Sequence, residues 1–162
     1  MPTHPQPPSL SRLYTRPGFL LRRAHQISAA VFEHECRDVG LTPAQFGVLT
    51  VLSARPGVGQ TSLARALGFD KVTALRVLRG LEGRGLVARA PSPDNKRNIS
   101  ASLTAAGAAL LAQAERPAEQ AYQRLLAPLD GEQQAQLLHL LQQLIGKLEN
   151  DARAAFVPAK QG

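Results

Sequence analysis

The sequence predicts a mainly α-helical protein with a small β-hairpin wing, in which a winged helix-turn-helix is joined to a helical dimerisation region. Three observations predict this fold. A helix with one apolar and one basic edge follows a tight turn at Gly68, two short alternating strands come directly after that helix, and helical segments rich in alanine and leucine flank the whole unit. We assign residues 12–40 and 104–156 to the dimerisation region and residues 41–103 to the winged helix-turn-helix.

The chain of 162 residues is long enough for one well-cored domain and short for two. We expect a single domain over residues 12–156, between an N-terminal arm of residues 1–11 and a frayed tail of residues 157–162. Proline fixes the backbone and removes a hydrogen-bond donor, so an extended or disordered arm is predicted from Pro2, Pro5, Pro7 and Pro8.

Two helices are predicted before the helix-turn-helix. The first begins at Pro17, because proline is tolerated in the first turn of a helix, and runs to about Arg37, before Gly40. The second begins at residues 42–45, Thr-Pro-Ala-Gln, which is the pattern of a capping box. The Arg-Pro-Gly sequence of residues 55–57 ends it.

The helix-turn-helix is predicted from two helices and the tight turn between them. Gly68 can close the first, supporting helix, and Asp70 can cap the second by accepting a backbone N–H. The second helix has an apolar stripe at Ala74, Val77, Leu78 and Leu81. Its other edge carries Lys71, Thr73, Arg76 and Arg79. In such a pair the second helix lies in the DNA major groove, with its N-terminal residues at the base edges.

A wing and two long helices follow. Residues 86–90 and 98–103 are predicted strands on either side of a polar turn, residues 91–97. Thr104 can cap a helix that reaches toward Leu126, and Pro117 predicts a kink or break inside it.

The last helix is capped by the Asp-Gly-Glu-Gln sequence of residues 130–133, and its apolar face is broad. Coiled-coil-like spacing is found at Leu137, Leu141, Leu144, Leu148 and Ala152, and the face is widened by Leu138, Leu140 and Ile145. So apolar a helix is not stable when exposed on a soluble monomer. We favour burial against the first helix of a partner subunit over folding back onto its own domain.

The chain carries a formal charge of +7, and the excess is local. Residues 60–97 contain eight Lys or Arg and three Asp or Glu. A basic surface attracts polyanions and makes their binding sensitive to salt, although charge alone fits a solubilising surface equally well. The single Cys36 excludes an internal disulfide, and neither a secretory signal nor an apolar run of about 18 residues is present, so we expect a cytoplasmic protein.

The order of these elements resembles the MarR family of bacterial transcription regulators. The resemblance covers residues 14–156 and includes Leu-Glu-Gly-Arg-Gly-Leu-Val at residues 81–87 and Ser-Leu-Thr-Ala-Ala-Gly at residues 102–107. It implies a triangular homodimer whose two lobes grip a pseudo-palindromic operator in double-stranded DNA. It also implies a repressor that an effector, bound near the junction of the two regions, releases from DNA.

The resemblance extends to the wing, with one departure. Family wings commonly carry Asp-x-Arg at the tip, whereas here Asn95 stands at the aspartate position and Arg97 is retained. The usual partner of the wing arginine is therefore replaced, and the neighbouring Asp94 can substitute for it in an ion pair. Arg97 is expected to enter a minor groove, where a narrow width strengthens the negative potential.

The candidate DNA-binding residues occupy the helix-turn-helix and the wing. Thr61 and Ser62 can donate to phosphates at a helix start. We assign base edges to Lys71, Thr73 and Arg76, and the DNA backbone to Arg79, Arg84 and Lys96. The full set is Thr61, Ser62, Lys71, Val72, Thr73, Arg76, Arg79, Arg84, Asn95, Lys96 and Arg97. The alternative for any one of the charged residues is a solvated surface charge.

The N-terminal stretch of residues 13–26 resembles the branch that controls aromatic-acid catabolism and, more weakly, repressors of nicotinate degradation. This implies a small aromatic or pyridine carboxylate as effector, such as a hydroxynicotinate. A buried carboxylate needs a cation or several donors. The candidate effector-binding residues are Arg16, Arg22 and His25 with Tyr14, Phe19 and Phe46 as walls. The alternative is that Arg22 and Arg23 form interface ion pairs and that His25 is a packing residue.

Other functions are less well supported. Cys36 can be read as a redox switch, but Glu33, Glu35 and Asp38 surround it with negative charge, which favours an inert thiol. The histidines show no metal-ligand spacing, and no catalytic constellation or cofactor motif is found, so we predict neither an enzyme nor a cofactor. The remaining alternatives are a thiol-sensing repressor of the same family and a winged-helix module that binds protein.

Overall fold

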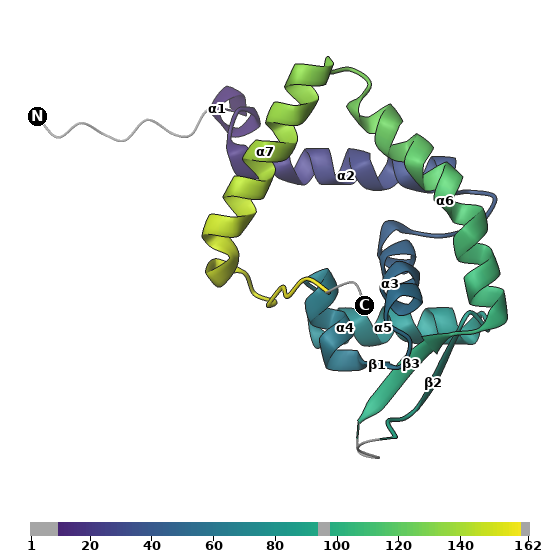
Figure 1. Cartoon of the computed structure of the whole chain (residues 1–162). Helices are drawn as coiled ribbons and strands as arrows, with labels where there is room; N and C mark the ends of the chain where they lie inside the picture. The colour runs from purple at the N-terminus through teal and green to yellow at the C-terminus, as the bar shows by residue number, and fades with distance from the viewer. Residues whose placement is uncertain (1–9, 94–97, 160–162) are drawn as a thin grey trace, which may run out of the picture.

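The computed structural model describes residues 10–93 and 98–159 (Figure 1). In Figure 1 a long helix, α2 (Pro17–Glu35), crosses the upper part of the molecule, with α6 (Ala105–Leu126) on the right and α7 (Gly131–Leu148) on the left. A lobe that contains the helix-turn-helix and the sheet lies beneath them. The predicted fold class is therefore confirmed.

The N-terminal region contains one helix that the sequence did not predict. Leu10 and Ser11, which we had assigned to the arm, begin α1 (Leu10–Tyr14), and residues 1–9 lie outside the described part of the chain. The prolines that disfavour a helix end at Pro8, and the Thr15 hydroxyl donates to the Arg12 carbonyl (3.2 Å) at the end of α1. Helix α2 begins at Pro17, as predicted.

The lobe begins with α3 (Pro43–Ala54). Its predicted capping box is confirmed, because the Gln45 N–H donates to Thr42 Oγ1 (3.3 Å) and the Thr42 N–H donates to Gln45 Oε1 (3.1 Å). The helix-turn-helix is formed by α4 (Gln60–Leu67) and α5 (Lys71–Gly83).

The sheet has three antiparallel strands in the order β1-β3-β2. The wing is formed by β2 (Val87–Pro91) and β3 (Ile99–Leu103), each within one residue of the prediction, with Val87 opposite Leu103. Strand β1 (Val58–Gly59) was not predicted, because two residues are too few for an alternating pattern. It pairs with β3, where the Gly57 N–H donates to the Ala101 carbonyl (3.0 Å).

Pro117 predicted a kink or a break in α6, and the helix continues through it, so the break does not occur. Proline at this position leaves the carbonyl of Gln113 without its helical donor. Gln113 is exposed, so water can satisfy that carbonyl and the cost of the proline is reduced. Helix α7 is capped at Asp130 as predicted, in a capping box with Gln133, and ends at Leu148. Ala152, which was predicted to continue the apolar row, instead follows the short η1 (Glu149–Asp151) and lies outside the helix.

Two core clusters meet at the joint between the lobe and the long helices. The lobe cluster includes Leu49, Leu52, Leu63, Leu78 and Leu81. The second cluster joins α2 to α6 and consists of Phe32, Cys36, Ala118 and Ala121. Val39 and Phe46 pack against both clusters. An ion pair between Glu35 and Arg124 (2.7 Å) also holds α2 against α6.

Helix α7 contains no buried residue. Its exposed apolar side chains are Leu137, Leu138, Leu140, Leu144, Ile145 and Leu148. The alternative in which this face folds back onto its own domain is therefore wrong. Within the described part of the chain, nothing buries it.

The segment after α7 returns to the lobe (Figure 1). The Val157 N–H donates to the carbonyl of Arg65 near the end of α4 (2.8 Å), and the Phe156 N–H donates to Glu149 Oε1 (2.9 Å). Val157, the first residue of the tail that was predicted to be frayed, is thus hydrogen-bonded to α4. Residues 160–162 lie outside the described part of the chain.

Candidate nucleic-acid interface

The turn of the helix-turn-helix is built from Gly68 and Asp70. Gly68 has φ +63° at the end of α4, a left-handed conformation that favours glycine. Asp70 caps α5 as predicted, because Oδ1 accepts from the Thr73 N–H (2.7 Å). The hydrogen bonds from Thr73 hold the pKa of Asp70 below its usual value. The start of α5 is therefore fixed relative to α4.

Helix α5 presents its basic edge to solvent. Ala74, Leu78 and Leu81 are buried and Val77 is half-buried, which confirms the predicted apolar stripe. Four candidate residues on the other edge are exposed: Lys71, Val72, Arg76 and Arg79. Val72 is 78% exposed, and an apolar side chain at this position suits contact with the methyl group of thymine.

Thr73 and the start of α4 differ in what they can offer to DNA. Thr73 is half-buried and its hydroxyl donates to Asp70 Oδ2 (3.1 Å), so it is less free than its neighbours. Thr61 and Ser62 are exposed in the first turn of α4, whose N-cap, Gly59, has no side chain. The amide groups and the positive end of the helix dipole there suit a phosphate.

Arg84 makes contacts within the protein that the sequence did not indicate. We assigned it to the DNA backbone, but its guanidinium donates to the carbonyls of Gly40 (2.8 Å) and Val39 (3.3 Å), in the turn between α2 and α3. Arg84 is the C-cap residue of α5, at the end opposite to the base-edge residues. Two nitrogens of its guanidinium are thus bonded within the protein, although the side chain is exposed.

The base of the wing is tied to α5. Arg89 on β2 donates to Glu82 Oε2 from both Nε (2.9 Å) and Nη2 (2.5 Å), in a partly buried ion pair. The candidate residues at the wing tip, Asn95, Lys96 and Arg97, lie outside the described residues.

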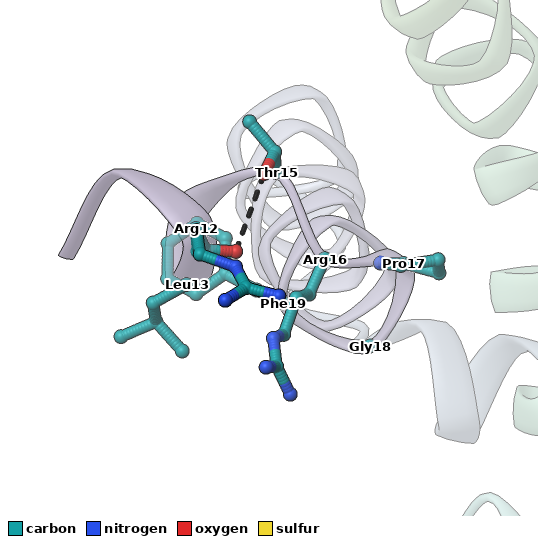
Figure 2. A pocket seen from close by; sticks show the side chains of 7 residues that line it. All are labelled: Arg12, Leu13, Thr15, Arg16, Pro17, Gly18 and Phe19. Carbon is teal, nitrogen blue, oxygen red and sulfur yellow. Dashed lines mark hydrogen bonds between the residues drawn. The ribbon is translucent and has the colours of Figure 1, made fainter. Parts of the chain in front are cut away.

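A hollow lies at the joint between α1 and α2, and Figure 2 shows the residues that line it. Two candidate effector residues, Arg16 and Phe19, are among them, together with Arg12 and Thr15, which the sequence analysis did not single out. Arg12 lies on α1, a helix that the sequence did not predict, so it was not considered as a partner of Arg16.

The other candidate effector residues divide into two groups. The Tyr14 ring lies 5.2 Å from the Phe19 ring, and the Arg22 guanidinium lies 5.2 Å from the same ring. Phe46 is not part of this group, because it packs against Phe32 (5.5 Å) at the joint between the core clusters. His25 is exposed on α2 and, among the described residues, makes no hydrogen bond or ion pair with the group.

Cys36 is buried among Phe32, Ala118 and Ala121. Burial, together with the Glu35 carboxylate, raises the pKa of its thiol. We therefore expect native protein to resist a thiol reagent such as DTNB at about pH 8, and protein unfolded in guanidinium to react fully. Absorbance of the released thiolate measures both. Fast modification of the native protein would restore the thiol-sensing alternative.

Two classes of feature are not found in residues 10–93 and 98–159. No cluster of three His, Cys, Asp or Glu side chains is placed to bind a metal ion. No helix in these ranges combines the length and apolar character needed to cross a bilayer.

Comparisons with known proteins agree with this geometry. The model of the MarR family matches residues 41–99. The transcriptional repressor NicR of Pseudomonas putida is 32% identical over 82% of this chain and 84% of its own length. Among solved structures, BpsR of Bordetella bronchiseptica, whose DNA binding is regulated by 6-hydroxynicotinic acid, is 30% identical with a TM-score of 0.77 over 85% of this chain and 96% of BpsR. The repressor CouR, bound to a 23-mer DNA duplex, is 36% identical with a TM-score of 0.76 over 86% of this chain and 99% of CouR.

Proposed function

The chain belongs to the MarR family, and we propose that it is a homodimeric repressor that grips a pseudo-palindromic operator and is released by a small aromatic or pyridine carboxylate. It is a DNA-binding transcriptional regulator and not an enzyme. The observation that carries the proposal is the exposed basic edge of α5, which begins at the Asp70 cap.

The exposed face of α7 supports the dimer. Six exposed leucine and isoleucine side chains on one 18-residue helix form an apolar surface of the kind that marks a subunit interface. A second copy related by a twofold axis buries this face and adds a second α5. Two such helices read half-sites about one helical turn of DNA apart.

Binding of DNA should depend steeply on salt. Each phosphate neutralised by Lys or Arg contributes a slope of about −0.9 to a plot of log affinity against log salt concentration. The exposed cations of α5, doubled in the dimer, predict a total slope of several units for a duplex selected by the protein from a random pool. Fluorescence anisotropy at increasing salt measures it. A flat plot would favour the protein-binding module instead.

The N-terminal hollow supports an anionic aromatic effector. Phe19 and Arg16 line this hollow, and Tyr14 and Arg22 both lie against the Phe19 ring. An aromatic ring can stack on Phe19 while a guanidinium pairs with its carboxylate. BpsR, a relative of this chain, is regulated by a pyridine carboxylate, 6-hydroxynicotinic acid.

A thermal-shift screen tests the effector. A ligand that binds only the folded state stabilises the protein by about 2.7 kcal/mol at 100 times its Kd. We expect hydroxynicotinates or hydroxybenzoates to raise Tm and the corresponding amides to have a smaller effect, because they lack the negative charge. Arg16→Gln should reduce the shift, and the matched control Arg153→Gln, an exposed arginine in the C-terminal segment, should not. An equal shift in both variants would exclude Arg16 from the site.

A further inference from the structure

We propose that Arg84 is a positioning residue that sets the direction of α5 relative to the dimerisation helices and does not touch DNA. This inference rests on the proposed function, a dimer with two lobes on one operator. It assigns to an exposed arginine in a basic region a role that depends on its contacts within the protein.

The Arg84 guanidinium bonds the backbone of the turn between α2 and α3. Nη1 of Arg84 donates to the Gly40 carbonyl at 2.8 Å, and Nη2 donates to the Val39 carbonyl at 3.3 Å. Two nitrogens of one planar group thus bond two consecutive carbonyls, and such charge-assisted bonds restrict rotation as well as distance. Arg84 itself is held by backbone bonds at the C-cap of α5, where its N–H donates to the carbonyl of Gly80 (3.3 Å).

The turn that Arg84 bonds is itself held by hydrogen bonds and packing. The N–H groups of Val39 (3.2 Å) and Gly40 (2.9 Å) both donate to the carbonyl of Cys36. Cys36 is buried in the cluster that joins α2 to α6, and Val39 packs against both core clusters. Arg84 therefore links α5 to the packing of α2 on α6 through one short, well-bonded turn.

A second set of hydrogen bonds holds the residues that follow Arg84. The Thr104 hydroxyl donates to the Gly85 carbonyl (2.7 Å), and the Thr104 N–H donates to the Leu86 carbonyl (3.1 Å). Thr104 is also the N-cap of α6. The C-terminal end of α5 is thus held between the end of α2, through Arg84, and the start of α6, through Thr104.

We call these contacts of Arg84 and Thr104 at the C-terminal end of α5 the clamp. Their effect is largest at the N-terminal end of the helix. The helix has 13 residues and a length of about 20 Å, so a rotation of about 6° at the clamp moves its first turn by about 2 Å. The first turn carries Lys71 and Val72. A shift of this size breaks hydrogen bonds to bases when both lobes must fit one duplex. A single lobe on a half-site can adjust its position freely.

The experiment compares wild type, Arg84→Ala and Arg79→Ala on two duplexes, one selected from a random pool by wild type and one that keeps a single half-site of it. Arg79 is the matched control, since it is exposed on α5 and makes no hydrogen bond or ion pair with the described residues. We expect Arg84→Ala to weaken full-site binding by about five- to tenfold, with half-site affinity and the salt slope unchanged. Arg79→Ala should weaken both duplexes and reduce the slope by about one per subunit.

Other outcomes overturn the inference. A slope reduced by Arg84→Ala means that Arg84 contacts phosphate, and equal losses on both duplexes mean that it supports a lobe only locally. Unchanged affinity for the full site excludes any role in binding. Arg84→Lys keeps the charge but cannot bond two carbonyls through two nitrogens of one planar group. If the lysine variant binds the full site as tightly as wild type, the positioning role is also excluded. If wild type does not prefer the full site, the proposed function fails instead.

Discussion

Arg76→Ala is expected to weaken operator binding by about 10- to 100-fold, which corresponds to about 1–3 kcal/mol for the loss of a contact to a base. Arg76 is exposed on α5, two turns before the clamped end, and makes no hydrogen bond or ion pair with the described residues. Its removal leaves the buried stripe intact, so folding and assembly should not change. Fluorescence anisotropy measures the affinity, and sedimentation equilibrium measures the oligomeric state.

Arg116→Ala is the matched control for this experiment. Arg116 is an exposed arginine on α6, outside the helix-turn-helix, so its removal changes net charge by the same amount without altering the candidate interface. We expect its operator affinity to stay close to that of wild type. Similar losses in the two variants would mean that affinity follows overall charge. An Arg76 variant that binds like wild type would remove Arg76 from the interface.

Gly107→Ala is expected to lower the free energy of unfolding by about 3 kcal/mol or more, because it adds a methyl group where the first turn of α6 already touches the backbone of Leu86. A Cβ atom at Gly107 would lie 2.0 Å from the Leu86 carbonyl oxygen and 3.0 Å from its carbon. Both are backbone atoms, so no flexible side chain can yield. The first turn of α6 would have to move away from the wing. Denaturation with guanidinium, followed by circular dichroism, measures the loss.

Gly80→Ala provides the comparison. Gly80 is exposed inside α5, and a Cβ there meets no atom within 4 Å. Alanine is favoured over glycine in a helix by about 0.5–1 kcal/mol, so this variant should be slightly more stable than wild type. The same substitution in two helices is therefore predicted to have opposite signs. A stable Gly107→Ala protein would contradict the close approach of α6 to Leu86.

The sequence was sufficient for elements with local signals. The caps of α3, α5, α6 and α7 depend on side chains within three residues of the helix start, and each was predicted from a short motif. The buried stripe of α5 follows from helical periodicity, which is also local. These two kinds of signal also placed the exposed basic edge of α5.

Contacts between distant parts of the chain could not be predicted from the sequence. Arg84 bonds Gly40, 44 residues away, and a basic residue beside a predicted recognition helix gave no sign of that partner. Phe46 was grouped with the N-terminal aromatic residues from its type and its place near the junction of the first two predicted helices, but the packing of α3 places it against Phe32. Strand β1 exists only because β3 lies beside it. Each of these features depends on tertiary structure that periodicity does not encode.

The docking of Val157 on α4 has a practical consequence for the experiments above. An affinity tag or fluorophore attached behind this residue begins beside the lobe that carries α5, whereas α1 lies on the far side of the molecule (Figure 1). A bulky C-terminal fusion would crowd an approaching duplex and lower the measured affinity through steric hindrance. Labels for binding assays therefore belong at the amino end.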